Sequence, residues 1–421
     1  MGYIIRTGIV VSIFFLLTTS SLFAQSYSFK PIPDVWYNTV DGVRLGLQFK
    51  GAKITDFGED DHRLNAGIWF GTNQPRNPIS YFFSFTESIS PISSYDNEAN
   101  VEFLSSSRAG LSRHGVFFSK RFSSAFDESK HKKIVTGFSI ERQFDFEYLI
   151  FQPFQRDWKA LFTLGFEQYN VNNYGPYRLI SRFRYNFNET SGRFARFESE
   201  ANQQFEAGAL SIKARGFLGL ISNFNAPEES FSLSFKPFID WADDPITRAR
   251  GTIPPVWLQI GNTHFAGGAN LRGYVEQDAA RLVAGGLVDR VLQSVASINL
   301  DVDFPNPVSN KLEQTSILKD VVQFRSYVFF DAGVAGKEGD NPTNDIRDTF
   351  QNPPPITPFP ENAIFDGGVG FTLDVNIPDF QGNRRGFVIR YELPFWVSQP
   401  QLGDENFKFR QIIGFGGIFT F

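Results

Sequence analysis

Residues 43–50 read VRLGLQFK, and this stretch predicts a strand rather than a helix. Every odd position, from Val43 to Phe49, is apolar, whereas the even positions are Arg44, Gly46, Gln48 and Lys50. Successive side chains of a β-strand point to opposite faces, so this strand has one oily and one polar face. The same alternation returns along the chain, most clearly at 63–70, 195–201, 210–218 and 387–393. We therefore expect an all-β fold.

The composition indicates that these strands cross a membrane. The chain has 421 residues, among them 49 Phe, 13 Tyr and 6 Trp, yet its mean hydropathy is negative. In a transmembrane barrel, apolar lipid-facing residues alternate with polar lumen-facing ones, so averages along the sequence cancel. No stretch after residue 24 approaches the ~18 uncharged apolar residues of a membrane helix. Roughly fourteen to sixteen alternating segments predict a transmembrane antiparallel β-barrel, with sixteen strands as the expected even number.

The first 24 residues have the pattern of a secretory signal peptide. Arg6 supplies the positive charge, residues 8–17 are apolar, and Ala24 is a small residue at the expected cleavage point. We expect a signal peptide at 1–24, a short N-terminal periplasmic segment at 25–41 and the barrel at 42–421, in the lipid bilayer of a bacterial outer membrane. The chain has no cysteine, which excludes disulfides and thiolate metal sites. Its net charge of −5 gives no reason to expect nucleic-acid binding.

Two long connections and the C-terminal strand stand out. Residues 221–294 separate two clear strands, and residues 336–362 carry a proline-rich run at Pro353, Pro354, Pro355, Pro358 and Pro360. Long loops of such barrels face outward, and a connection of about 70 residues is usually functional. The chain ends on Phe421, inside a predicted last strand that begins near Phe409. A terminal aromatic in the last strand is typical of a membrane interface.

Three ordered motifs in the C-terminal half carry a family resemblance. Residues 267–274 read GGANLRGY, residues 299–305 read NLDVDFP, and residues 327–333 read YVFFDAG. Together they resemble the BamA-like (bacterial surface antigen) superfamily, in which a Val/Leu-Arg-Gly-Phe/Tyr tetrad folds back into the lumen. The resemblance covers mainly residues 205–421. It implies sixteen strands and a long loop folded into the barrel.

Alternation also predicts the partners of the loop arginine. It places Asp301 and Asp331 on the lumen faces of their strands. Arg272, at the tip of the inserted loop, could then bridge Asp331, with Asp301 as a second partner, because a guanidinium fork matches a carboxylate bidentately. The alternative is that Arg272 is one more arginine of a polar pore.

Small residues beside the arginine support a close approach of loop and wall. Gly273 and Gly333 lack side chains that would separate the two backbones. Tyr274 is expected to pack against Phe329 or Tyr327. We call Arg272, Gly273, Tyr274, Asp301, Asp331 and Gly333 the lumen latch.

No catalytic, cofactor or metal constellation is visible in the sequence. The four histidines are dispersed, and Ser112 and His114 occur in GLSRHG, which is not a Gly-x-Ser-x-Gly elbow. We therefore expect no enzyme activity and no cofactor. Four arginines are expected to face the lumen: Arg182, Arg184, Arg196 and Arg215. We expect them to pair with Glu198 and Glu200, because a charged barrel interior requires such pairs.

The resemblance implies outer-membrane protein assembly or polypeptide translocation. In the family, the seam between the first and last strands is thought to open and offer unpaired edges to a client strand. Here that seam would join Val43–Phe49 to Phe409–Phe421. The chain has no room for the periplasmic POTRA domains of many members, so a separate periplasmic or outer-membrane partner is expected beside a polypeptide client. The alternative is a structural or pore-forming barrel for gated passage of small solutes.

Overall fold

The computed structural model describes residues 27–416, apart from gaps at 56–57, 74–76, 95–96, 125–126, 150–153, 209, 242–247, 255, 258–260, 284–289, 316–320, 337, 341–362 and 379–383. The predicted signal peptide, the proline-rich run and Phe421 lie outside these residues. Predictions about them therefore stay predictions.

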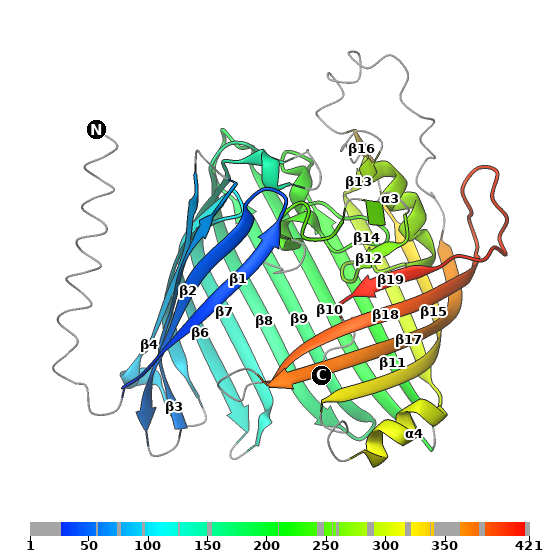
Figure 1. Cartoon of the computed structure of the whole chain (residues 1–421), viewed down its shortest axis with the longest axis horizontal. Coiled ribbons are helices and arrows are strands. Elements are labelled where there is room, and N and C mark those ends of the chain that lie inside the picture. The colour runs from blue at the N-terminus through cyan, green and yellow to red at the C-terminus, as the bar shows by residue number, and fades with distance from the viewer. Residues whose placement is uncertain are drawn as a thin grey trace.

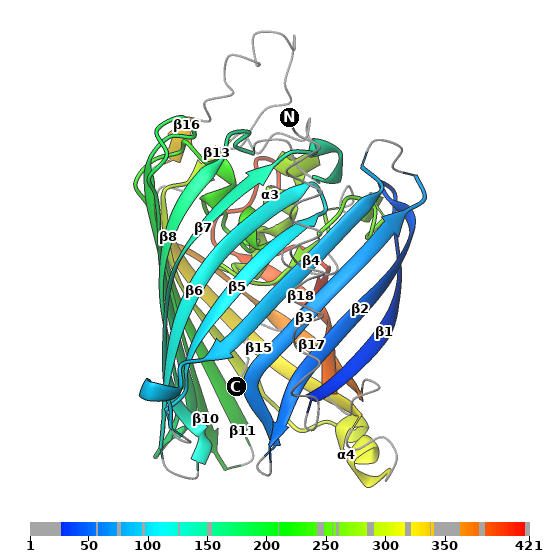
Figure 2. The same cartoon turned by 90° about the vertical axis from the view of Figure 1, so that its left-hand side faces the viewer.

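One antiparallel sheet dominates the described residues and curls into a barrel (Figures 1 and 2). The sheet has seventeen strands, of which β12 (Thr263–Phe265) lies inside the barrel; the other sixteen pair with their neighbours in chain order. The predicted all-β antiparallel barrel of sixteen strands is thus confirmed. These strands are β1 (Tyr27–Asn38), β2 (Gly42–Thr55), β3 (Gly58–Gly71), β4 (Ile79–Ser88), β5 (Ala99–Arg108), β6 (Leu111–Ser124), β7 (Asp127–Gln143), β8 (Lys159–Asn172), β9 (Gly175–Asn186), β10 (Phe194–Ala207), β11 (Leu210–Ile221), β14 (Ser294–Asp303), β15 (Val322–Ala335), β17 (Ile364–Pro378), β18 (Arg384–Val397) and β19 (Ile412–Phe415).

The start of the barrel differs from the prediction. Residues 25–41 were expected to lie outside the barrel, but Tyr27–Asn38 form β1, so Val43–Phe49 belong to the second strand. Strand β1 was not predicted because it contains Pro31 and Pro33. Proline has no N–H to donate to the hydrogen-bond ladder of a sheet, so it counts against a strand. Proline is tolerated on edge strands, and within the described residues β1 pairs with β2 alone.

Alternation along each strand separates an apolar exterior from a polar interior. Leu45, Phe138 and Ile298 point outward and are at least half exposed, at 50%, 62% and 56%. Glu141 and Asn299, on the opposite faces, are fully buried. An apolar outer face around a charged interior is the arrangement of transmembrane barrels. None of the helices in the described part of the chain is long and apolar enough to cross a membrane.

The long connection between β11 and β14 fills part of the lumen. It contains the short helices η4 (Pro227–Glu229), η5 (Phe238–Trp241) and η6 (Arg272–Tyr274), helix α3 (Val275–Val283), and strands β12 and β13 (Arg290–Leu292). Figure 1 shows α3 and β12 inside the curve of the sheet. The largest buried apolar clusters join this loop to the wall, with Phe235, Trp241 and Phe265 at the centre of one. The predicted insertion of the long loop is therefore seen in the structure.

Four further elements lie outside the sixteen-strand sheet. Helix η2 (Ser90–Ile92) and helix η3 (Phe146–Tyr148) occupy connections between strands, and α4 (Pro307–Gln314) joins β14 to β15. Strand β16 (Glu338–Asp340) pairs with β13 in a separate two-stranded sheet. None of these elements was predicted, because each is too short to show a periodic pattern.

The predicted seam is not formed by the described residues. Strand β19 pairs with β18 on one side and, in parallel, with β12 on the other. The expected partner of the last strand, Val43–Phe49, instead pairs with β1 and β3. Phe409 precedes β19 and is 71% exposed. A strand from the lumen loop thus occupies the edge that was expected to face the first strand.

Candidate functional site

The loop that carries Arg272 approaches the wall through a tight turn. Gly267, Gly268 and Asn270 have positive φ values of 136°, 59° and 54°. Glycine adopts this region without a steric penalty, and asparagine tolerates it better than most residues. The turn leads directly into η6, whose first residue is Arg272. The local sequence GGAN therefore aims the arginine at β14 and β15.

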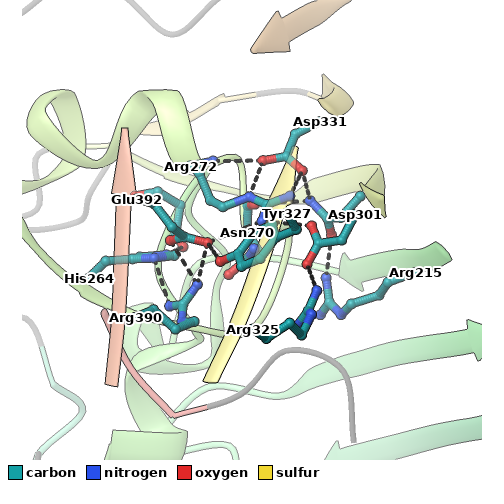
Figure 3. A network of polar contacts seen from close by, with 12 residues as sticks. Arg215, His264, Asn270, Arg272, Asp301, Arg325, Tyr327, Asp331, Arg390 and Glu392 are labelled. Carbon is teal, nitrogen blue, oxygen red and sulfur yellow. Dashed lines mark hydrogen bonds and ion pairs between the residues drawn. The ribbon is translucent and has the colours of Figure 1, made fainter. Parts of the chain in front are cut away.

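Arg272 forms a buried ion-pair network with three carboxylates (Figure 3). Its Nε and Nη2 donate to the two oxygens of Asp331, at 2.8 and 2.7 Å. Its Nη1 donates to Asp301 at 2.9 Å and to Glu392 at 3.1 Å. The Arg272 side chain is 0% exposed, and so is that of Asp331. The structure thus brings together the arginine and both aspartates of the lumen latch.

Glu392, on β18, is a third partner that was not predicted. Tyr327 donates its hydroxyl hydrogen to Glu392 Oε1 at 2.6 Å, and Arg390 Nη1 donates to Oε2 of Glu392 at 3.0 Å. Arg390 Nη2 also donates to His264 Nδ1 at 3.0 Å, which leaves His264 Nε2 to donate to a loop carbonyl at 2.7 Å. The network therefore extends from β15 through β18 to the lumen strand β12.

The charge of Arg272 is further stabilised by an aromatic ring. Its guanidinium carbon lies 3.9 Å from the ring centroid of Phe329, within the range of a cation–π contact. Burial alone would lower the pKa of Arg272, but Asp331 and Asp301 outweigh burial and raise this pKa well above its ordinary value. The guanidinium is therefore a permanent cation.

The two glycines of the latch, Gly273 and Gly333, allow the loop backbone to approach the barrel wall closely. Tyr274, in contrast, does not pack against Phe329 or Tyr327 as expected. A Cβ on Gly273 would lie 2.5 Å from Val397 Cγ1, and one on Gly333 would lie 2.8 Å from a methyl of Leu271. Tyr274 does not belong to a cluster with Phe329 or Tyr327. It packs among Leu271 and Val397, because η6 turns its ring toward the ends of β17 and β18.

A second buried ion cluster holds the beginning of the same loop. Lys159 Nζ, on β8, lies 2.7 Å from Glu228 and 3.2 Å from Glu229, both on η4. Arg184 Nη1, on β9, lies 2.7 Å from Glu229. Glu141, on β7, accepts from both cations at 2.9 and 3.1 Å. We call Glu141, Lys159, Arg184, Glu228 and Glu229 the second anchor of the loop, the lumen latch being the first. It could not be predicted from alternation, because Glu228 and Glu229 belong to an irregular loop.

The lumen arginines find carboxylate partners, with one difference from the prediction. Arg182 and Arg196 pair with Glu198 at 3.2 and 2.7 Å, and Arg215 pairs with Glu200 at 2.6 Å. Arg184 belongs to the second anchor instead, because the buried glutamates of η4 lie within its reach.

A short parallel pairing joins the lumen loop to the last strand. Thr263, His264 and Phe265 pair with Ile413, Gly414 and Phe415. A Cβ on Gly414 would lie 2.5 Å from a guanidinium nitrogen of Arg390, so a glycine at this position makes room for the buried arginine. The ion-pair network and the β12–β19 pairing therefore meet at β18 and β19.

The described residues contain no group of three or more histidines and carboxylates that could hold a metal ion. The chemistry that this arrangement offers is charge pairing and strand pairing.

Neither protein-family models nor curated proteins match the sequence. Among solved structures, BamA from Haemophilus ducreyi lacking POTRA domains 1–3 aligns with a TM-score of 0.45 and 14% identity, over 92% of this chain and 69% of that one. OccK11 (OpdR) from Pseudomonas aeruginosa aligns with a TM-score of 0.31 and 9% identity, over 92% of each chain. Likeness this distant assigns no family. By the pairing and faces of its own strands, the chain is an antiparallel β-barrel of the outer-membrane type.

Proposed function

We propose that this barrel resides in the bacterial outer membrane and acts, as a BamA-like protein, in outer-membrane protein assembly or polypeptide translocation. The three ordered motifs of the C-terminal half support the relationship. So does the position of Arg272 against the aspartates of the other two motifs. A separate periplasmic or outer-membrane partner and a polypeptide client complete the proposal.

The observation that carries the proposal is the pairing of β12 with the edge of β19. This pairing involves three residues on each strand and is parallel. Parallel pairing is slightly less stable per residue than antiparallel pairing. An extended client segment could replace β12 by strand addition, in which main-chain hydrogen bonds supply the affinity. The edge of β19 is therefore the proposed client site.

The opposite edge of the sheet is less suited to that role. Pro31 and Pro33 lack N–H groups, so β1 offers fewer donors than an ordinary edge strand. Prolines on an edge are one way in which proteins discourage the addition of foreign strands. A client would accordingly pair with β19 first.

A disulfide between β12 and β19 tests this proposal. Thr263 and Ile413 are register partners, and adjacent strands lie about 4.8 Å apart, within the Cα separation that a disulfide requires. The chain has no native cysteine, so Thr263→Cys with Ile413→Cys can form one internal bridge. The matched control joins β5 to β6 through Ser107→Cys with Ser112→Cys, which are also register partners.

We expect the locked β12–β19 protein to fail to support assembly of outer-membrane proteins in a deletion strain, and a reducing agent to restore it. The β5–β6 control should support assembly under both conditions. Normal assembly by the oxidised β12–β19 protein would contradict the proposed client site. Affinity purification from native outer membrane then identifies the partner and client.

A pore for small solutes is the second candidate, and the charged lumen wall favours it. Arg182 and Arg178, for example, line the interior and are partly exposed. Planar-bilayer conductance separates the two candidates. A large, steady conductance that is unaffected by substitution of Arg272 would favour the pore. Small, erratic conductance with co-purifying proteins would favour assembly or translocation.

A further inference from the structure

A groove of about 580 Å³ lies on the outer face of the barrel, across β4 to β8. Its floor is formed by small residues, Ser105, Gly115 and Ala160. Apolar side chains surround the floor, and most of them are well exposed on the membrane side. They are Phe83, Phe103, Val116, Phe138, Ile140 and Phe187. A volume of this size is typical of small-molecule sites, which span about 300–1,000 Å³.

Two polar residues lie among the apolar side chains of this groove. Ser105 and His114 are register partners on β5 and β6, and Ser105 Oγ lies 2.9 Å from His114 Nδ1. Their side chains face outward, because Arg113, next to His114, points into the lumen and contacts Glu141. The hydroxyl of Tyr81 lies 3.3 Å from Ser105 Oγ and extends the polar chain.

The ring of His114 retains one unused nitrogen, Nε2. If the Ser105 hydroxyl donates to Nδ1, the neutral imidazole carries its hydrogen on Nε2. Among the described residues, His114 Nε2 has no hydrogen-bond partner; the nearest aromatic ring is that of Trp158, with centroids 6.3 Å apart. A polar group on a lipid-facing surface is costly unless it is hydrogen-bonded. With the hydrogen on Nε2, the groove offers one donor to a molecule that lies in the hydrocarbon.

We propose that this groove binds a membrane phospholipid, with one acyl chain along the apolar walls and its ester carbonyl accepting a hydrogen bond from His114 Nε2. The membrane itself supplies this ligand to the outer face. The amide groups of β5 and β6 are engaged in the sheet, so they do not form an oxyanion hole. The Ser105–His114 pair is therefore suited to binding a lipid ester and not to cleaving it.

A photoreactive lipid tests the proposal. The barrel is placed in nanodiscs of phosphatidylethanolamine containing a phosphatidylglycerol with a diazirine on one acyl chain, and labelled residues are identified by mass spectrometry. The reference surface is β11, where Leu218 and Leu220 are 38% and 42% exposed on the same outer face. We expect labelling of Phe103 and Val116 to exceed labelling of this reference by about fivefold, the equilibrium factor of one hydrogen bond.

Four variants separate binding from ordinary lipid contact. His114→Phe should remove the preference, whereas His114→Gln, which keeps a donor, should retain most of it. Leu218→Phe, on the reference surface, should leave it unchanged. Ala160→Trp fills the groove and should also abolish the preference. All variants are compared at equal amounts of folded barrel, measured by the mobility of unheated samples on gels. Equal labelling of both surfaces in the native protein, or an unchanged preference in His114→Phe, would overturn the proposal.

Discussion

Substitution of Arg272 by alanine should strongly destabilise the barrel. The guanidinium donates two hydrogen bonds to Asp331 and one each to Asp301 and Glu392, and its side chain is fully buried. Removing one partner of a buried ion pair costs about 3–5 kcal/mol, because the remaining charges lose their compensation. Three carboxylates lose a partner here. We therefore expect the free energy of unfolding to fall by at least about 3 kcal/mol.

Heat-modified mobility on gels and urea unfolding in detergent both measure this loss. Arg193→Ala is the matched control, because Arg193 pairs with Glu189 on the surface, where the two side chains are 59% and 76% exposed. Surface pairs contribute at most about 1 kcal/mol, so the control should resemble the native protein. Asp331→Ala should destabilise the barrel as Arg272→Ala does, and the double variant should cost less than the sum of both.

The reasoning would be refuted if Arg272→Ala and Asp331→Ala both unfolded like Arg193→Ala. It would also be refuted if the effects of the two latch substitutions were additive, because independent residues show no interaction energy.

Three further substitutions test other parts of the lumen by the same unfolding measurement. Glu229→Gln should lower the free energy of unfolding by about 3–5 kcal/mol, because two buried cations lose a charge partner; Glu189→Gln, on the surface, should have little effect. Gly273→Ala should cost about 1–3 kcal/mol through overpacking, since its Cβ would lie 2.5 Å from a valine methyl on β18, whereas Gly216→Ala, with open space around it, should cost less. Asp366→Asn should leave stability unchanged or raise it, because the fully buried carboxyl of Asp366 lies beside the carboxyl of Asp331, and an amide can donate to Asp331 without a second negative charge; a loss of more than about 1 kcal/mol would contradict this.

Alternation made the wall side of the site predictable. A period of two determines which residues of a strand face the lumen, so Asp301 and Asp331 could be assigned to the lumen face from the sequence alone. The same pattern was visible at 387–393, where Arg390 and Glu392 share a face. Glu392 was missed because no motif drew attention to it, although the signal was present.

The loop side of the site had no comparable signal. Glu228 and Glu229 lie in irregular structure, where the sequence does not determine the direction of a side chain. Strand β12 has three residues, fewer than a periodic pattern requires. Its pairing with β19 depends on the path of the whole loop, which local sequence does not encode. Local sequence does not encode the direction of the Tyr274 side chain either, because this direction follows from the turn at η6.

The two buried ion clusters also have a mechanical consequence. The loop forms ion pairs with β7, β8 and β9 on one side of the barrel and with β14, β15 and β18 on the other. It therefore connects these two arcs of the barrel wall across the lumen. At the β1–β2 turn, the loop contacts the wall through a neutral hydrogen bond from Thr39 Oγ to the carbonyl of Arg250, which is weaker than a charged one. Backbone amide exchange would measure this difference, and equal protection of both arcs would contradict it. We therefore expect bending of the barrel to be concentrated in the arc that begins at β1, with the arc that the two ion clusters join remaining rigid.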